Sequence, residues 1–505
     1  MMTRSDRLTA LASVTAVLSI GLLHAQGRGG GAWTTSQGDA QRSGWIRNDA
    51  KVSVESMQKP GFQFLWKNTL DNRARQLQNL TQPIMLPNII SYKGFKALAF
   101  VGGSSDTVFS IDYDLNRMFW TRRLSAAAPP SAGTPACPGA LTTITRQTNV
   151  APAGSGRGGG GGGGGGRGVG NNTIAVASSG MVHVLNPQTG EDMTPPVKFL
   201  PPNVTASAAI LIDGTVYAAT VGNCGGSADG VYAVDLAPTG GGGVMSWTAG
   251  GAPIVGSAGP AFGADGTVYV ATGSGPGTAN AVVALDGKTL TIKSSFASST
   301  PFTSSPVVFT HQGRDYVAVT NRDGKLYLLD STAMAQAPAM STPYASGTFA
   351  TGALASWAAA GGTRWILVPS GGMPTPANAF TSNGAVTNGS VLAFTVVDQG
   401  GRPTLQPAWA SRDLTSPVAP MVMNGVVFAL STGEFRGAGA AAERAQRSSP
   451  AVLYALDGTT GKEYWNSGRT MTSFVHDVSP SGTDSQVYVV THDGTLYAFG
   501  MPMER

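Results

Sequence analysis

Short stretches that alternate apolar and polar positions recur along the chain, and four of them follow an Asp-Gly pair. They occupy residues 213–217, 265–269, 323–327 and 493–499. Asp-Gly tolerates the positive φ angles that a tight hairpin turn requires, and the alternation then places side chains on defined faces of a strand. The turns recur after 52 residues (213 to 265) and again after 58 (265 to 323). A hairpin pattern with such a period predicts a radial repeat protein.

The best-formed unit of this repeat is residues 415–465. It holds four strand patterns in succession, and four consecutive antiparallel strands make one blade of a β-propeller. The expected strands are 416–419, 426–430, 452–457 and 462–465, with turns at Asn424-Gly425 and Thr460-Gly461. The same frame predicts blades at 83–120, from 141, at 205–247, at 254–293, from 303, at 351–409 and at 473–499.

The last unit contains only three strand patterns, of which the first is 474–478. The missing fourth strand is available near the N-terminus, where residues 62–66 read as a strand that ends in Trp66 and belongs to no blade. We therefore predict an all-β, eight-bladed propeller of four-stranded antiparallel blades, closed by this N-terminal strand. Closure removes the exposed sheet edges of an open array. Seven blades are the alternative, if the weak second or sixth unit is an insertion.

Residues 453–465 have the form Leu-Tyr-Ala-Leu-Asp-x-x-Thr-Gly-x-x-x-Trp. This form resembles the repeat of pyrroloquinoline-quinone (PQQ) propellers, and the resemblance covers essentially the whole mature chain. It implies that a tryptophan packs between neighbouring blades and that the Thr-Gly turn positions it. The tryptophans in the corresponding places are Trp66, Trp120, Trp247, Trp409 and Trp465.

The N-terminus resembles a secretory signal, with Arg4 and Arg7 before a mostly apolar stretch from Leu8 to Leu23. The stretch is short for a membrane span. We expect a signal peptide at 1–25 that is cleaved, and an uncleaved anchor helix is the alternative. No cysteine follows the stretch, so no lipid attachment is expected, and the mature protein should be periplasmic or secreted. A lead-in segment (26–60) then precedes the propeller (61–505), which carries a glycine-rich insertion at 153–170.

Composition narrows the function classes. Only 12% of the residues are charged, the net charge is +5 and the pI is about 9.2. Because no run of Lys and Arg is interleaved with aromatic residues, nucleic acid is not an expected partner. The two cysteines, Cys137 and Cys224, form no Cys-x-x-Cys-His motif, so covalent haem is not expected. They could pair between adjacent blades, or they could be separate thiols.

Candidate ligand-binding residues are those on the innermost strands, which line the central channel of a propeller. Arg146 could bind a carboxylate, and Trp357 could offer a stacking surface. On the expected strand 474–478, His476 and Asp477 are adjacent, so only one of them can face the channel. Each residue also has a structural interpretation: an ion pair for Arg146, inter-blade packing for Trp357, a satisfied buried side chain for His476 and a turn contact for Asp477.

The resemblance also defines what an enzyme of this fold would carry. PQQ-dependent alcohol dehydrogenases usually have a disulfide between adjacent cysteines, Ca²⁺ bound by a Glu, an Asn and an Asp, and a further catalytic Asp. Here no cysteines are adjacent, no local motif places Ca²⁺ ligands, and no histidines pair at metal-binding spacing. The sequence thus favours an exported binding or assembly scaffold, with a protein or small-molecule ligand at a propeller mouth. Residues 371–389 and 433–449, expected as surface loops, could cover that mouth.

Two enzyme classes remain as alternatives. The first is a PQQ-dependent dehydrogenase that oxidises an alcohol or a sugar, with PQQ and Ca²⁺ as cofactors. The second is a propeller hydrolase or lyase, for which no nucleophile-elbow motif is found.

Overall fold

The computed structural model of the 505-residue chain describes residues 32–91, 94–128, 137, 142–150, 171–236, 243–346 and 351–502. The expected signal peptide (1–25) and the glycine-rich insertion (153–170) lie outside these residues. Among the described helices, none is both long and apolar enough to cross a membrane.

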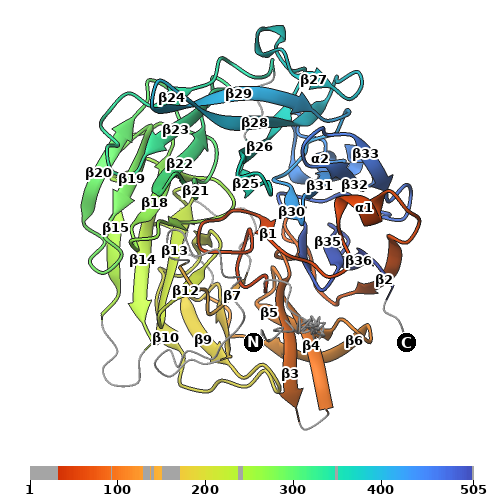
Figure 1. The fold of residues 1–505 in the computed structure, drawn as a ribbon. Coiled ribbons are helices and arrows are strands. Elements are labelled where there is room, and N and C mark those ends of the chain that lie inside the picture. Colours follow the sequence, from red (N-terminus) through yellow and green to blue (C-terminus); the bar gives the residue numbers. More distant parts are fainter. Residues whose placement is uncertain are drawn as a thin grey trace, which may run out of the picture.

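Eight small sheets surround one axis and form a closed ring (Figure 1). The first four blades follow the chain in order, each with its first strand innermost. Blade 1 is β3 (Ile84–Ser91), β4 (Gly94–Gly102), β5 (Thr107–Asp112) and β6 (Arg117–Arg123). Blade 2 is β7 (Thr143–Arg146), β8 (Thr173–Val176), β9 (Met181–Leu185) and β10 (Val197–Lys198). Blade 3 is β11 (Thr205–Ala206), β12 (Ile210–Ile212), β13 (Thr215–Val221), β14 (Gly230–Asp235) and β15 (Met245–Thr248). Blade 4 is β16 (Ile254–Val255), β17 (Ala261–Phe262), β18 (Val268–Thr272), β19 (Ala281–Leu285) and β20 (Ile292–Ala297).

The remaining blades carry the additions to the repeat. Blade 5 is β21 (Val307–His311), β22 (Arg314–Thr320), β23 (Leu326–Asp330) and β24 (Ala339–Met340). Blade 6 is β25 (Ala355–Ala358), β26 (Arg364–Gly371), β28 (Gly389–Gln399), β29 (Arg402–Ala410) and β27 (Thr381–Ser382), with the 3₁₀-helix η1 (Pro376–Asn378). Blade 7 is β30 (Met421–Met423), β31 (Val426–Ser431), β32 (Val452–Asp457) and β33 (Glu463–Asn466), with helix α2 (Ala441–Arg447) and, from the N-terminus, β1 (Trp45–Ile46). Helix α1 (Val54–Met57) leads to blade 8, which is β34 (Ser481–Thr483), β35 (Gln486–Val490), β36 (Thr495–Gly500) and β2 (Gln63–Thr69).

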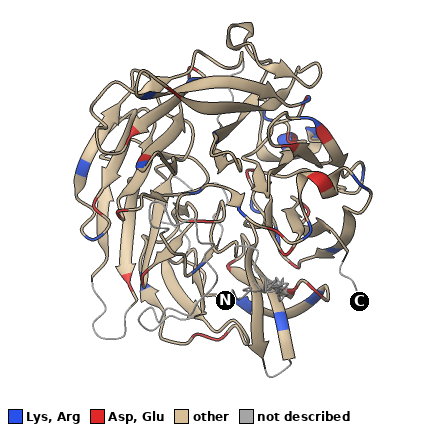
Figure 2. Cartoon of the chain, in the orientation of Figure 1, with Lys and Arg blue, Asp and Glu red and all other residues tan. Residues whose placement is uncertain are grey.

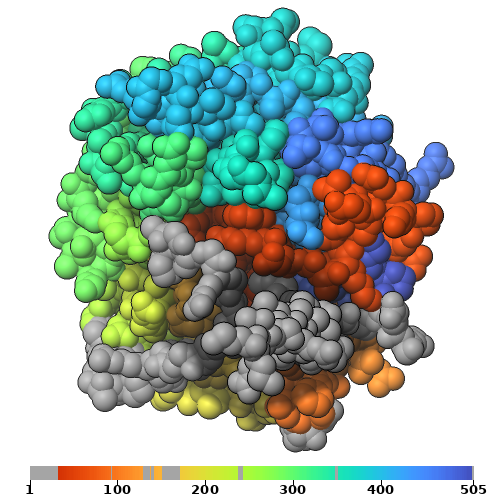
Figure 3. All heavy atoms as spheres, viewed as in Figure 1, coloured from red at the N-terminus to blue at the C-terminus, as the bar shows by residue number. Residues whose placement is uncertain are grey.

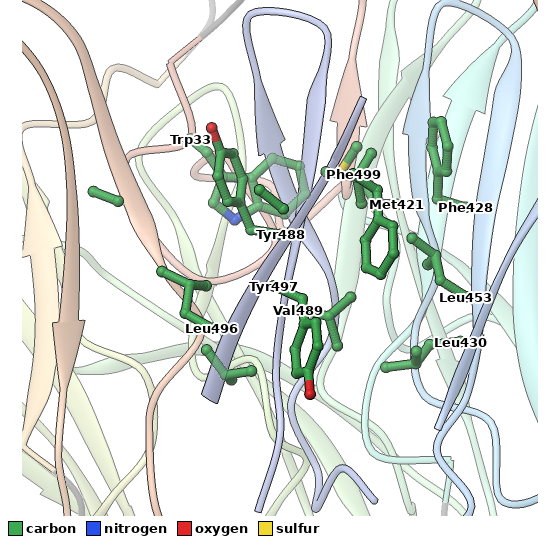
Figure 4. Close-up of a cluster of buried hydrophobic side chains, with 14 of the residues drawn as sticks. Trp33, Met421, Phe428, Leu430, Leu453, Tyr488, Val489, Leu496, Tyr497 and Phe499 are labelled. Atoms are coloured by element: carbon green, nitrogen blue, oxygen red, sulfur yellow. The ribbon is translucent and has the colours of Figure 1, made fainter. Parts of the chain in front are cut away.

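The N-terminal strand closes the ring. β2 pairs antiparallel with β36, and Lys67 lies opposite Tyr497 in the register. The apolar side chains between blades 7 and 8 then form one buried cluster, which includes Phe428, Leu453 and Phe499 (Figure 4). The prediction of eight blades closed by an N-terminal strand is confirmed, and the seven-blade alternative is wrong.

The expected first strands of the last two blades were placed too early. Residues 416–419 and 474–478 are not strands, and β30 and β34 begin a few residues later. Each begins directly after a proline, Pro420 or Pro480, whose missing N–H group is tolerated at the first position of a strand. A proline directly precedes β3, β16, β17 and β21 in the same way.

The Asp-Gly turns are of two kinds. Asp213 and Gly214 both have positive φ (46° and 85°) and form the expected two-residue hairpin. At the turns that contain Asp265, Asp323 and Asp493, only the glycine has positive φ. The first two turns join a first strand to a second, whereas the last two join a second strand to a third. The spacing of 52 residues therefore connects equivalent positions, and the spacing of 58 does not.

The two expected surface loops are partly ordered into secondary structure. Residues 371–389 contain η1 and β27, and β27 pairs in parallel with β29 at the outer edge of blade 6. Residues 433–449 contain helix α2, none of whose residues is buried.

Two of the five tryptophans expected between blades show how neighbours dock. The indole Nε1 of Trp120 donates to the carbonyl of Pro187 (2.8 Å), and that of Trp409 donates to the carbonyl of Gly458 (3.2 Å), each in the next blade. A Cβ atom on Gly461 would lie 2.5 Å from the ring of Trp409, so only glycine leaves room for the indole there. The other three are partly buried: Trp66 lies 6.0 Å from Tyr488, Trp465 lies 4.9 Å from Phe62, and Trp247 packs against the core of blades 3 and 4.

Replacing Trp409 by alanine should lower the free energy of unfolding by about 3–5 kcal/mol, because a fully buried indole leaves a cavity. Trp465→Ala is the matched comparison: its indole is only partly buried, so the loss should be smaller. Urea denaturation of both variants measures the difference. A loss below about 1 kcal/mol for Trp409→Ala would contradict the docking role.

Candidate functional site

The chain's own N-terminus fills the central channel of this propeller. Residues 33–49, which we call the channel segment, lie at the centre of the ring (Figures 1 and 3). Trp33, Gln37, Ala40 and Arg42 of this segment are each at most 1% exposed. The innermost strands therefore face polypeptide at the level of this segment.

The channel segment contacts all eight blades, and one series of its hydrogen bonds follows the blades in sequence order. In blades 1, 2, 4, 5, 6 and 7, a backbone N–H of the innermost strand donates to a carbonyl of the segment at 2.7–3.0 Å. In blade 3 the direction is reversed, because the Thr35 hydroxyl donates to the carbonyl of Ala209 (2.9 Å). In blade 8 the N–H of Ser485 donates to the Asp49 carboxylate (2.8 Å). For the six backbone bonds, written with the N–H donor of the blade first and the carbonyl acceptor of the segment second, the pairs are Met85–Trp33, Arg146–Thr34, Phe262–Ala40, Val308–Gln41, Ser356–Ser43 and Val422–Gly44.

Arg42 anchors the middle of this circuit. Its guanidinium donates to the carbonyls of Pro260 (2.8 Å), Ala208 (3.2 Å) and Ser36 (2.9 Å), and to the Thr35 hydroxyl (2.7 Å). Burial lowers the pKa of Arg42 to about 9, and the nearby Asp39 carboxylate opposes this shift. The channel segment thus supplies a buried cation, which donates hydrogen bonds to carbonyl oxygens of blades 3 and 4.

Ala258, Ala353 and Ala419 form one small buried cluster. They lie near the first strands of blades 4, 6 and 7.

The structure places the two expected channel residues in contacts between blades. The Arg146 guanidinium donates to the carbonyls of Met85 (3.0 Å) in blade 1 and Asn171 (3.3 Å) in blade 2, and burial lowers its pKa to about 10. Trp357 stacks on Trp365 with ring centroids 5.9 Å apart and lies against Gly458 of blade 7. Both residues join neighbouring parts of the ring.

His476 and Asp477 lie together with a buried glutamate that the sequence analysis did not single out. We call Glu434, Arg436, Arg444, His476 and Asp477 the blade 7–8 cluster. It joins the loop between β31 and β32 to the segment before β34, and in Figure 2 acidic and basic positions meet beside α2. The Glu434 side chain is fully buried (0% exposed).

Glu434 holds this cluster together. One of its carboxylate oxygens contacts the Arg444 guanidinium (2.5 Å) and His476 Nδ1 (2.8 Å), and the other pairs with Arg436 Nε (3.1 Å). Arg436 also pairs with Asp477 (2.5 Å). The cluster therefore links a fully buried carboxylate, two guanidinium groups, an imidazole and a second carboxylate.

The strand argument for His476 and Asp477 is wrong, because this segment is not a strand. Asp477 has a φ of 51°, and this turn brings its carboxylate to 3.5 Å from His476 Nε2. The two side chains thus lie on the same side. Although burial acts to raise the pKa of Asp477, the charges of Arg436 and His476 lower it below the ordinary value.

Glu434, His476 and Asp477 are close enough together to share a metal ion. However, both oxygens of Glu434 already face guanidinium groups, and a cation placed there would meet two positive charges. The arrangement fits an ion-pair network better than a metal centre.

Cys137 and Cys224 form a disulfide in the structure, with Cα atoms 5.0 Å apart. Cys224 lies in the loop between β13 and β14 of blade 3, and Cys137 lies before the first strand of blade 2. The bridge therefore joins adjacent blades.

Two surface hollows lie between neighbouring blades and do not involve the channel segment. One, of about 540 Å³, lies between blades 1 and 2 and includes Asn88, Asn172 and Gln188 in its lining. The other, of about 360 Å³, lies between blades 6 and 7 beside the ion pair of Arg412 and Glu463 (2.6 Å).

Comparison with known proteins gives the fold a name. The family model described as outer membrane protein assembly factor BamB matches residues 361–500. The quinohemoprotein alcohol dehydrogenase of Comamonas testosteroni superposes with a TM-score of 0.55 at 14% identity, over 94% of this chain and 82% of that one. The fold is a PQQ-like β-propeller. A europium-containing methanol dehydrogenase has a similar likeness, with a TM-score of 0.56 at 11% identity over 93% of this chain and 98% of that one. No curated protein matches the sequence.

A PQQ-like fold raises the question of whether the channel could hold the quinone. The channel segment lies at the centre of the ring and accepts hydrogen bonds from six innermost strands, and Arg146 donates to backbone carbonyls. These residues do not fit a planar tricarboxylate, which needs an open slot and free cationic groups.

Asp477→Asn should remove a contribution to stability that depends on pH. Because the folded-state pKa lies below the ordinary 3.8, the contribution is present above about pH 4 and is lost as pH falls further. The difference in melting temperature between wild type and Asp477→Asn should therefore be largest at neutral pH and shrink below pH 4. A difference that is constant from pH 3 to pH 7 would contradict this assignment.

Loss of the disulfide should destabilise the protein, because the bridge closes a loop with a sequence separation of 87 residues. In the chain-entropy estimate the loss is about 4.6 kcal/mol. Cys224→Ser should lower the melting temperature as much as reductant lowers that of the wild type, and reductant should not affect the variant. Differential alkylation with mass spectrometry provides the direct check: two alkylated cysteines in unreduced protein would exclude the bridge.

Proposed function

We propose that this PQQ-like propeller is a binding or assembly scaffold without catalytic activity. The supporting observation is the channel segment, which fills the axis and contacts every blade. A propeller whose axis is filled by its own chain offers partners its rims, its loops and the hollows between its blades.

The loop that carries α2 is a suitable contact surface for a protein partner. Helix α2 has seven residues, none of them buried, and an isolated helix of that length is not stable in water. It is held by the ion pair of Arg444 with Glu434 and by the guanidinium of Arg447, which lies 3.5 Å from the ring centroid of Phe435. Apart from Arg444, which pairs with the buried Glu434, the ring thus presents an ordered, exposed element.

The scaffold is proposed to work outside the cytoplasm, in the periplasm or after secretion. The expected signal peptide supports this location. The disulfide between Cys137 and Cys224 is consistent with it, because such bridges persist in oxidising compartments.

The rival function is a PQQ-dependent dehydrogenase acting on an alcohol or a sugar. The fold likeness to quinoproteins does not favour it, since identities of 11–14% establish the fold alone. The residues of the site must therefore distinguish the dehydrogenase from the scaffold. The channel segment, which lies where a cofactor would bind, favours the scaffold.

Titration of purified protein with PQQ and Ca²⁺, followed by dye-reduction assays with alcohols and aldoses, separates the two functions. We expect no saturable change in tryptophan fluorescence and no turnover. A PQQ-dependent alcohol dehydrogenase carried through the same titration serves as the positive control. Saturable binding of PQQ with turnover would contradict the scaffold proposal and support the dehydrogenase function.

A further inference from the structure

The contacts of the channel segment resemble those of a bound peptide more than those of a core element. In six blades the wall donates backbone N–H groups and the segment supplies carbonyls. Only β1 forms a short strand pairing, in parallel with β30 of blade 7. The rest of the segment turns on itself, as in the hydrogen bond from the Gly44 N–H to the Gln37 carbonyl (2.9 Å), so the wall receives a folded peptide and not an added strand.

The anchors of the segment are few and well separated. Trp33 lies in the apolar cluster that also holds Tyr488 (Figure 4). Arg42 donates to four oxygens, two of which are the carbonyls of Pro260 in blade 4 and Ala208 in blade 3. Gln37 adds a third anchor, since its backbone N–H donates to the Gln82 side chain (3.0 Å) and its own amide donates to the carbonyl of Leu354 (3.1 Å).

The segment is joined to the rest of the chain by an exposed connection. After α1, residues 58–61 are all exposed, and they lead directly to Phe62 and β2. Cutting the chain in this connection would leave β2 with the propeller and separate only the part that holds the channel segment.

We propose that the wall of the central channel is a binding site for a turn-rich polypeptide segment and that residues 33–49 are its resident ligand. The ligand class is a segment that directs carbonyls outward to several blades. It also carries an arginine that donates hydrogen bonds to carbonyls of blades 3 and 4. While the segment is attached, its high effective concentration excludes any competitor. This inference rests on the channel contacts alone and does not depend on the scaffold function.

The test uses the full chain with a protease site introduced between Gln58 and Gly61. After native cleavage, the N-terminal fragment should co-elute with the propeller in size-exclusion chromatography. Thermal unfolding of the complex should remain a single cooperative transition. Introducing Arg42→Ala into the same chain should let the fragment dissociate. The change removes the two hydrogen bonds from Arg42 to the wall, at Pro260 and Ala208, and the two within the segment that orient the guanidinium. Asn48→Ala is the matched control: Asn48 is exposed at the end of the segment, and its fragment should stay bound.

A fluorescent synthetic peptide of residues 32–50 then probes the site directly. We expect saturable binding, measured by anisotropy, to the cleaved Arg42→Ala protein and none to the uncleaved wild type. A peptide carrying Arg42→Ala should bind at least tenfold more weakly, and one carrying Asn48→Ala should bind as the wild-type peptide does. Three results would each overturn the proposal: dissociation of the wild-type fragment on cleavage, unfolding of the cleaved propeller, or peptide binding that is indifferent to Arg42.

Discussion

The innermost strands of a closed propeller leave one row of backbone N–H and C=O groups without a strand partner, and those groups point at the axis. Buried groups of this kind must be hydrogen-bonded, because leaving them unpaired in a dry interior is costly. Here the channel segment supplies carbonyl acceptors to six blades, a donor hydroxyl to blade 3 and an acceptor carboxylate to blade 8. The Arg42 guanidinium and the Trp33 indole are buried along with these contacts.

The architecture was predictable because its signals are local. Each blade repeats a turn and an alternating strand, and in blade 7 the strands expected at 426–430 and 452–457 correspond to β31 and β32. The closing strand was also predictable, since residues 62–66 read as a strand without neighbours and the last unit lacked one. The first strands of blades 7 and 8 were misplaced because apolar residues before Pro420 and Pro480 imitate the pattern, whereas the proline itself marks where the strand begins.

The channel segment could not be predicted, because its order comes from partners spread over the whole ring. Residues 33–49 show no strand or helix periodicity, and nothing in the sequence indicates which carbonyl will meet Arg42. Arg146 and Trp357 were correctly placed on first strands, but periodicity does not reveal whether a side chain faces the axis or a neighbouring blade. Glu434 was missed because it lies in an insertion rich in Ala and Gly. The available signal was the close succession of Glu434, Arg436 and Arg444, which is unusual in a chain with so few charges.

The order in which the chain is made gives the channel segment a further consequence. Its partners in blades 7 and 8, and the β36 edge that receives β2, are the last parts of the ring to be synthesised, although the segment itself comes among the first. Every intermediate that lacks the final blade must therefore carry an unplaced N-terminal tail and an open β edge. An open β edge is a template for pairing with another chain, and the finished ring has none at this position. The position of the tail thus distinguishes a complete chain from an incomplete one.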